Sequence, residues 1–161
     1  MSASALCARK KRSHRKKAVK FMIPPVPQSC MDRHVNGDLN LVAAWVGFLA
    51  GVVSGIVPGL LFHGEEWMGG YGSWRRRLTR LGHVSFFGIG FLNLGFGLTV
   101  RALDLEGGLA MASALFITGA VTMPLLCYLS AWKKPFRHLF FIPVVSLAGG
   151  ITITLWKIWP S

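Results

Sequence analysis

The sequence predicts an all-α integral membrane protein, a four-helix bundle of transmembrane helices behind a disordered basic tail. Four long blocks of the 161-residue chain contain no charged residue, at 39–62, 84–100, 107–132 and 139–156. A bilayer core needs about 20 predominantly apolar residues for each crossing helix, with a range of about 17 to 25. Each block meets that length, and none has the polar outer face of a soluble amphipathic helix.

Residues 1–38 differ in composition from the rest of the chain. The segment 9–20, which begins with Arg9 and ends with Lys20, holds eight Lys or Arg and no acid, and three prolines follow it. This composition is typical of a disordered basic tail. Anionic lipid suits these charges as a partner, whereas nucleic acid is less favoured. A second interpretation is that translation starts near Met31, which would remove most of the tail.

The first predicted helix, at about 39–62, carries a small residue at every fourth position: Ala43, Gly47, Gly51, Gly55 and Gly59. Glycine in a helix interior costs roughly 1 kcal/mol relative to alanine in water, so four in register need a reason. A four-residue spacing places them on one face, where small residues let helices approach closely in lipid. This glycine zipper predicts a packing face for a neighbouring helix or for a second chain.

Three further helices are predicted, at about 84–103, 108–132 and 139–158. In the first of these, Gly90 and Gly97 are seven residues apart and therefore share a face. Because small residues recur on several helices, the sequence predicts a tight bundle in which the first helix lies inside.

An amide, Asn93, lies in the middle of the second predicted helix. A buried amide in lipid needs a partner, and an interhelical hydrogen bond is worth roughly 0.6–2 kcal/mol. Thr118 and Thr122, four residues apart on the third predicted helix, are the candidate partners. Asn93 is therefore interpreted as a helix-packing residue.

The connecting segments predict the orientation of the chain. The segment 63–83 contains four arginines and the segment 133–138 contains three Lys or Arg, and both lie on the same side of the predicted bundle. The positive-inside rule places these loops in the cytoplasm and both termini outside. The charges of 9–20 argue for the opposite orientation, although most lie far from the first helix. The short loops favour a bacterial plasma membrane.

Three histidines lie near the ends of predicted helices, on the same predicted side as two glutamates: His63, His83 and His138. Imidazoles and carboxylates can bind a transition metal, and histidines on two helices can ligate a haem iron. Histidine at a helix boundary is also an ordinary amphipathic residue at the headgroups. We therefore expect no metal site and no cofactor, with haem b as the alternative.

No catalytic arrangement is present in the sequence. No charged residue lies in the middle of a predicted span, as proton-coupled transporters generally need, and no Ser-His-Asp set or phosphate-binding loop occurs. The sequence predicts a non-catalytic accessory or scaffold subunit that contacts the lipid bilayer and other membrane subunits or a second copy. The alternatives are a haem- or quinone-linked electron-transfer protein and a tether that works through 9–20.

Overall fold

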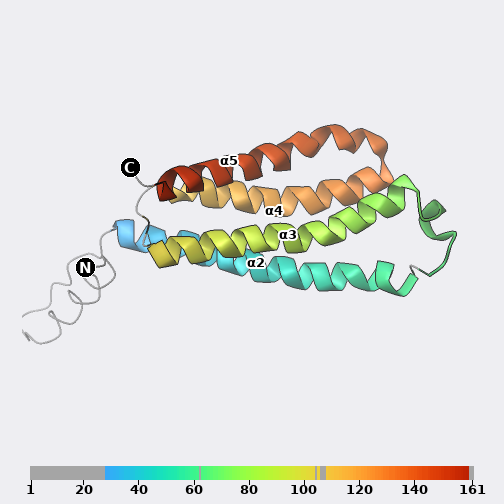
Figure 1. The fold of residues 1–161 in the computed structure, drawn as a ribbon, viewed down its shortest axis with the longest axis horizontal. Helices are drawn as coiled ribbons and strands as arrows, with labels where there is room; N and C mark the ends of the chain where they lie inside the picture. Colours follow the sequence, from blue (N-terminus) through green and yellow to red (C-terminus); the bar gives the residue numbers. More distant parts are fainter. Residues whose placement is uncertain (1–27, 62, 104, 106–107, 160–161) are drawn as a thin grey trace, which may run out of the picture.

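Four long helices joined by short connections make up most of the described chain (Figure 1). The computed structural model describes residues 28–61, 63–103, 105 and 108–159, with side chains from Gly37 onward. The long helices are α2 (Gln28–Leu61), α3 (Trp74–Leu103), α4 (Leu109–Trp132) and α5 (Phe141–Ile158). Two short 3-10 helices, η1 (Trp67–Gly69) and η2 (Lys134–Phe140), precede α3 and α5. The predicted all-α fold with four long helices is confirmed for this part of the chain.

Two helices begin earlier than their apolar blocks. Helix α2 begins at Gln28 instead of Leu39, so residues 28–38 are helical, whereas 1–27, including the basic segment 9–20, lie outside the described residues. Pro27 is the last proline before the apolar block, and without a proline the helix can continue upstream. An apolar block predicts only the part of a helix that suits the bilayer core, and not its polar turns.

Helix α3 begins at Trp74, ten residues before Val84, so the second half of the predicted loop 63–83 belongs to this helix. Ser73 caps this helix, because its Oγ accepts a hydrogen bond from the backbone N–H of Arg76 at 3.2 Å. The arginines of this segment and the apolar block that follows it are therefore parts of one continuous helix.

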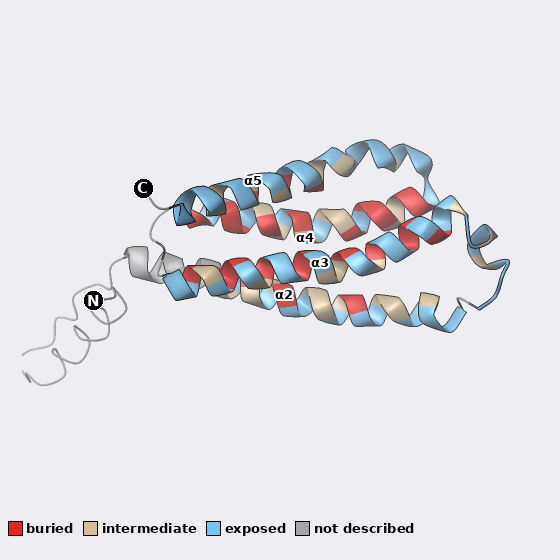
Figure 2. Cartoon of the chain, viewed as in Figure 1, coloured by how far each residue is buried: buried red, intermediate tan, exposed pale blue. Residues whose placement is uncertain are grey.

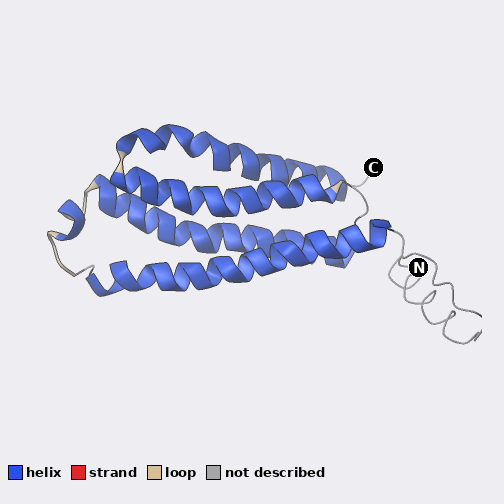
Figure 3. Cartoon of the chain, turned by 180° about the vertical axis from the view of Figure 1, so that it is seen from behind, coloured by secondary structure: helices blue, strands red, loops and turns tan. Residues whose placement is uncertain are grey.

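All four long helices are long and apolar enough to cross a membrane. They run alternately up and down, so the α2–α3 and α4–α5 connections lie at one end of the molecule (Figures 1 and 3). The end of α3 and the start of α4 lie at the other end, as does the end of α5. Both segments that the sequence assigns to one membrane side therefore lie at the same end.

The interior is formed mainly by α3 and α4, and α2 and α5 flank them (Figure 2). In the most apolar windows, 33% of α3 residues and 39% of α4 residues are buried, against 11% for α2 and 17% for the α5 span. The expectation that the first helix lies inside the bundle is therefore wrong. Only one face of α2 carries small residues, and large aliphatic side chains elsewhere on it, such as Leu49 and Val53, are exposed.

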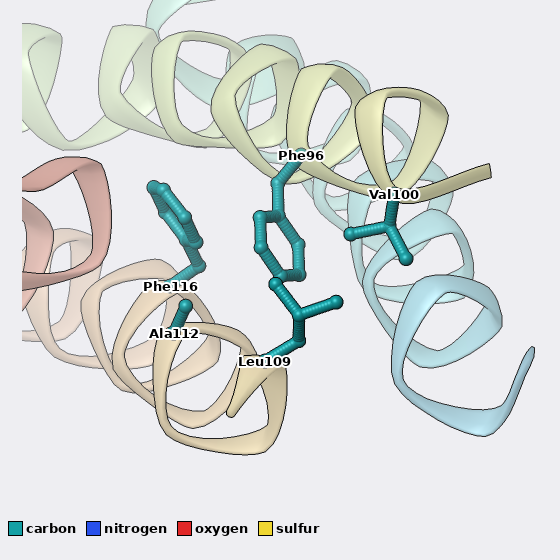
Figure 4. Close-up of a cluster of buried hydrophobic side chains, with 5 residues drawn as sticks. All are labelled: Phe96, Val100, Leu109, Ala112 and Phe116. Carbon is teal, nitrogen blue, oxygen red and sulfur yellow. The ribbon is translucent and has the colours of Figure 1, made fainter. Parts of the chain in front are cut away.

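The hydrophobic core lies between α3 and α4, toward their connection. Phe96 and Val100 of α3 point toward Leu109, Ala112 and Phe116 of α4 (Figure 4). The rings of Phe96 and Phe116 have centroids 5.0 Å apart and are tilted by 41°. Helix α5 adds Leu147 and Ile153 to the edge of this cluster, which attaches it to the α3–α4 pair.

Candidate functional site

Three polar side chains meet where α2, α3 and α4 come together. Asn40 of α2 donates from Nδ2 to Oδ1 of Asn93 of α3 at 2.7 Å, and Ser113 of α4 donates from Oγ to Oδ1 of Asn40. Asn40 and Asn93 are 0% exposed and Ser113 is 2% exposed. We call these three residues the amide cluster. It is a buried polar connection that joins all three helices at one place.

Asn93 also binds the backbone of two helices. Its Nδ2 donates to the carbonyl oxygen of Ile89 at 3.0 Å, within α3, and to that of Phe116, in α4, at 3.4 Å. An unpaired polar group in an apolar interior costs about 1–3 kcal/mol, so each of these partners matters. The amides and the hydroxyl are neutral, and their chemistry here is hydrogen bonding. The amide cluster therefore joins the three helices through neutral hydrogen bonds.

The predicted partners of Asn93 are wrong. Thr118 donates to the carbonyl oxygen of Ala114 at 2.8 Å, and Thr122 donates to that of Thr118 at 2.7 Å, so both bind their own helix. Asn40 is the partner that sequence reasoning missed. The sequence does indicate this partner, because Asn40 is itself an amide within the first apolar block.

The small residues of α2 lie along α3 of the same chain. A Cβ at Gly51 would lie 2.7 Å from the ring of Phe87, and one at Gly55 would lie 2.6 Å from the ring of His83. A Cβ at Gly47 would lie 3.4 Å from the carbonyl oxygen of Phe86. Between Gly47 and Gly55 this face is thus occupied by a neighbouring helix, whereas no atom lies within 4 Å of a Cβ at Gly59. Ala43, one turn earlier, is half-buried.

The small residues of α3 face α2 in return. A Cβ at Gly90 would lie 2.6 Å from Cε1 of Phe48, and one at Gly97 would lie 2.9 Å from both the carbonyl oxygen of Gly37 and Cγ of Leu41. The contact at Gly97 is with backbone, which cannot rotate away as a side chain can. Gly97 therefore sets how closely α2 and α3 approach near the amide cluster.

The three histidines lie on different elements. His83 is inside α3, where its Nδ1 lies 3.2 Å from Oγ of Ser54 and its ring meets that of Phe87 edge-on at 5.4 Å. His63 is exposed in the α2–α3 connection, and His138 is exposed on η2, where its Nε2 accepts a hydrogen bond from Nε of Arg137 at 3.4 Å. Among the described residues, no group of three His, Cys, Asp or Glu is arranged to hold a metal ion.

Arg101, near the end of α3, pairs with a residue of α2. Its guanidinium forms an ion pair with Asp38 of α2, and Nε donates to Oδ1 at 3.1 Å. Both side chains are about half exposed, so this pair adds little stability. It nevertheless joins α2 to α3 at the end where the amide cluster lies.

No protein-family model, characterised protein or solved structure matches this chain. Its function therefore has to be inferred from its own residues. Its buried amides supply neutral hydrogen bonds, and its glycines allow close contact between α2 and α3.

Asn40→Ala and Asn93→Ala should each lower the free energy of unfolding in detergent by about 1–2 kcal/mol, because each leaves a buried partner unpaired. The double variant should lose clearly less than the sum of the two, since the lost bond is shared. Thr118→Val is the control and should change the value by less than about 0.5 kcal/mol. Strictly additive losses would show that the two amides are not coupled.

Gly97→Ala should destabilise the protein by about 1–3 kcal/mol, because its methyl group meets the backbone of Gly37. Gly95→Ala, two residues away on the same helix, is the matched control, since no atom lies within 4 Å of its Cβ. That variant should be neutral or up to about 1 kcal/mol more stable, because alanine is the better helix former. Thermal unfolding of both variants in the same detergent distinguishes them, and equal midpoints would contradict the packing described here.

Proposed function

We propose that this chain is a non-catalytic accessory or scaffold subunit of a membrane complex in a bacterial plasma membrane. The observation that carries the proposal is the contrast between its interior and its surface. Three buried polar side chains, Asn40, Asn93 and Ser113, join the molecule's own helices, while two flanking helices present large apolar surfaces outward. Such a chain is suited to filling space between other membrane helices or to bringing them together.

The outward surface of α2 supports this role. It runs from Leu39 to the end of the helix and consists of exposed aliphatic and aromatic side chains: Leu39, Val42, Trp45, Val46, Leu49, Val52, Val53, Ile56, Val57, Leu60 and Leu61. Helix α5 has a second such surface that includes Val144, Val145 and Ile151. Lipid tails and apolar helices of another subunit both match this chemistry.

The chemistry of the described spans also favours a structural role. Asn40, Asn93 and Ser113 are bonded to one another and are out of reach of a substrate. The charged residues that the structure describes lie toward the ends of the helices, as Arg101 and Lys157 do. A transported ion or proton would need an ionisable group along its path, and these spans offer none at mid-depth.

The distribution of charge supports an orientation with the segments 63–83 and 133–138 in the cytoplasm. Four arginines at the start of α3 and three Lys or Arg in the α4–α5 connection lie at one end of the molecule. In the described helices, the Lys and Arg of the opposite end are Arg33 of α2, Arg101, which is paired with Asp38, and Lys157. Under the positive-inside rule, the strongly basic end faces the cytoplasm.

The test is photo-crosslinking in the native host. A benzophenone amino acid is placed at Leu49 on α2 and, separately, at Val145 on α5, both exposed positions on different helices. A subunit bound at one face should be captured as a discrete heavier band from that position and not from the other. Crosslinks to lipid alone from both positions would overturn the proposal.

The visible spectrum of the protein purified from its native host in mild detergent tests the electron-transfer alternative. A protein that carries haem through His83 and His138 would show a Soret band that is lost in His83→Ala and in His138→Ala. We expect no Soret band, together with stoichiometric partner proteins after purification in mild detergent. A histidine-dependent Soret band in a sample without partners would replace the scaffold proposal with electron transfer.

A further inference from the structure

One end of the molecule gathers cations from two separate segments. The first turns of α3 supply Arg75, Arg77 and Arg80, and the α4–α5 connection supplies Lys133, Lys134 and Arg137. We call these six exposed residues the basic surface. The two segments are held together, because Nε1 of Trp74 donates to the carbonyl oxygen of Ser130, in the last turn of α4, at 3.0 Å.

The basic surface lacks internal neutralisation. Within the part of the chain that the structure describes, none of its six residues forms an ion pair with a carboxylate. Cations in the first turn of a helix oppose the helix dipole, so their position does not stabilise α3. The position of the three arginines at the start of α3 is therefore explained better by an anion outside the chain than by the stability of that helix. Lys133 and Lys134 follow the C-terminus of α4, where a cation also suits the helix dipole.

The loop before α3 holds two arginines in place. The guanidinium carbon of Arg80 lies 4.6 Å from the centre of the Tyr71 ring, and one of its nitrogens donates to the carbonyl oxygen of Tyr71 at 3.5 Å. The guanidinium of Arg76, a residue only 4% exposed, lies 5.0 Å from the same ring and 5.7 Å from that of Trp67. Stacking on aromatic rings orients a guanidinium and leaves its N–H groups able to donate.

The backbone of this loop is itself fixed by short-range bonds. Met68 and the two glycines after it have positive φ angles, of 57°, 87° and 88°. The turn is closed where Oγ of Ser73 donates to the carbonyl oxygen of Met68 at 2.7 Å. Tyr71 is therefore presented at a defined place above the first turns of α3.

Exposed aromatic side chains place this surface at the headgroup level. Trp74 is the first residue of α3 and Trp132 is the last residue of α4, and Trp132 and Tyr71 are 80% and 68% exposed. Tryptophan and tyrosine are enriched at the boundary between bilayer and water. Cations directly beside such residues, at the ends of apolar helices, lie where lipid phosphates are found.

We propose that the basic surface binds anionic phospholipid, and that Arg80, oriented by Tyr71, is its principal phosphate contact. The planar guanidinium can donate two parallel hydrogen bonds to phosphate oxygens, which an ammonium group cannot do. Lys133, Lys134 and Arg137 attract the same headgroups from the neighbouring segment. This surface is independent of the apolar faces that a partner subunit would use.

The experiment uses the full chain purified in a non-ionic detergent. Lipid adducts are counted by native mass spectrometry after mixing with phosphatidylglycerol or with phosphatidylcholine of the same acyl chains. The unmodified protein should retain phosphatidylglycerol at least about tenfold more strongly. Arg75→Gln/Arg77→Gln/Arg80→Gln should lose most of this preference. The matched control, Arg101→Gln/Lys157→Gln, removes charges from the opposite end and should keep it.

A second variant separates a positioned site from diffuse charge. Tyr71→Leu keeps every cation but removes the ring that orients Arg80, and it should weaken phosphatidylglycerol retention several-fold. Retention unchanged in Tyr71→Leu would overturn the assignment of Arg80 and Tyr71. Equal retention of both lipids by the unmodified protein would overturn the proposal itself. So would displacement of phosphatidylglycerol by a short RNA at low concentration, because the surface would then suit nucleic acid.

Discussion

The hydrogen bond between Asn40 and Asn93 is the constraint on which the arrangement of α2, α3 and α4 depends. Each amide lies in an apolar interior, where an unpaired donor or acceptor is costly. Apolar contacts tolerate sliding and rotation of helices, whereas a hydrogen bond at 2.7 Å does not. Asn93 also reaches a carbonyl of α4, and Ser113 of α4 reaches Asn40. A shift of any one of the three helices would break at least one of these bonds, so the cluster fixes their register.

The glycines make that hydrogen bond geometrically accessible. Asparagine side chains are short, so two of them can meet only when their helix backbones come close. Gly97 lies one turn from Asn93 on α3, and the carbonyl oxygen of Gly37, about one turn from Asn40 on α2, lies 2.9 Å from where a Gly97 Cβ would be. Farther along, Gly47 and Gly90 continue the close approach, with 3.9 Å between a Gly47 Cβ and the Cα of Gly90. Small residues and paired amides therefore act together. The small residues let the two helices approach closely, and the amide hydrogen bond fixes their register.

The sequence predicts where the helices lie in the chain better than it predicts which helices pack against one another. Four long uncharged blocks indicate four apolar helices, because a helix that crosses a bilayer needs about 20 apolar residues and such a run is visible from composition alone. The face of Gly47, Gly51 and Gly55 is also readable, since helical periodicity fixes it. Three other features depend on how helices far apart in sequence pack. These are the identity of the helix against that face, the position of α2 at the outside of the bundle, and the pairing of Asn93 with Asn40. Periodicity within one helix contains no such information, and Thr118 and Thr122 illustrate the difficulty, because hydroxyls satisfy themselves on their own helix.

The buried amides lie within the helix bundle, whereas the charged residues lie toward the helix ends, and this difference follows from the cost of burying a charge. A buried amide costs little free energy when it is hydrogen-bonded, so Asn40 and Asn93 can form a hydrogen bond between α2 and α3 in the interior. Guanidinium groups cost far more to bury, so the arginines of α3 lie in its first and last turns. Most of them are exposed there, and the buried Arg76 lies against the rings of Trp67 and Tyr71. Because one continuous helix carries both groups, the register set by the amides also sets where the arginines stand relative to the apolar spans. The internal packing of α3 thus determines the height at which its basic end meets the surroundings.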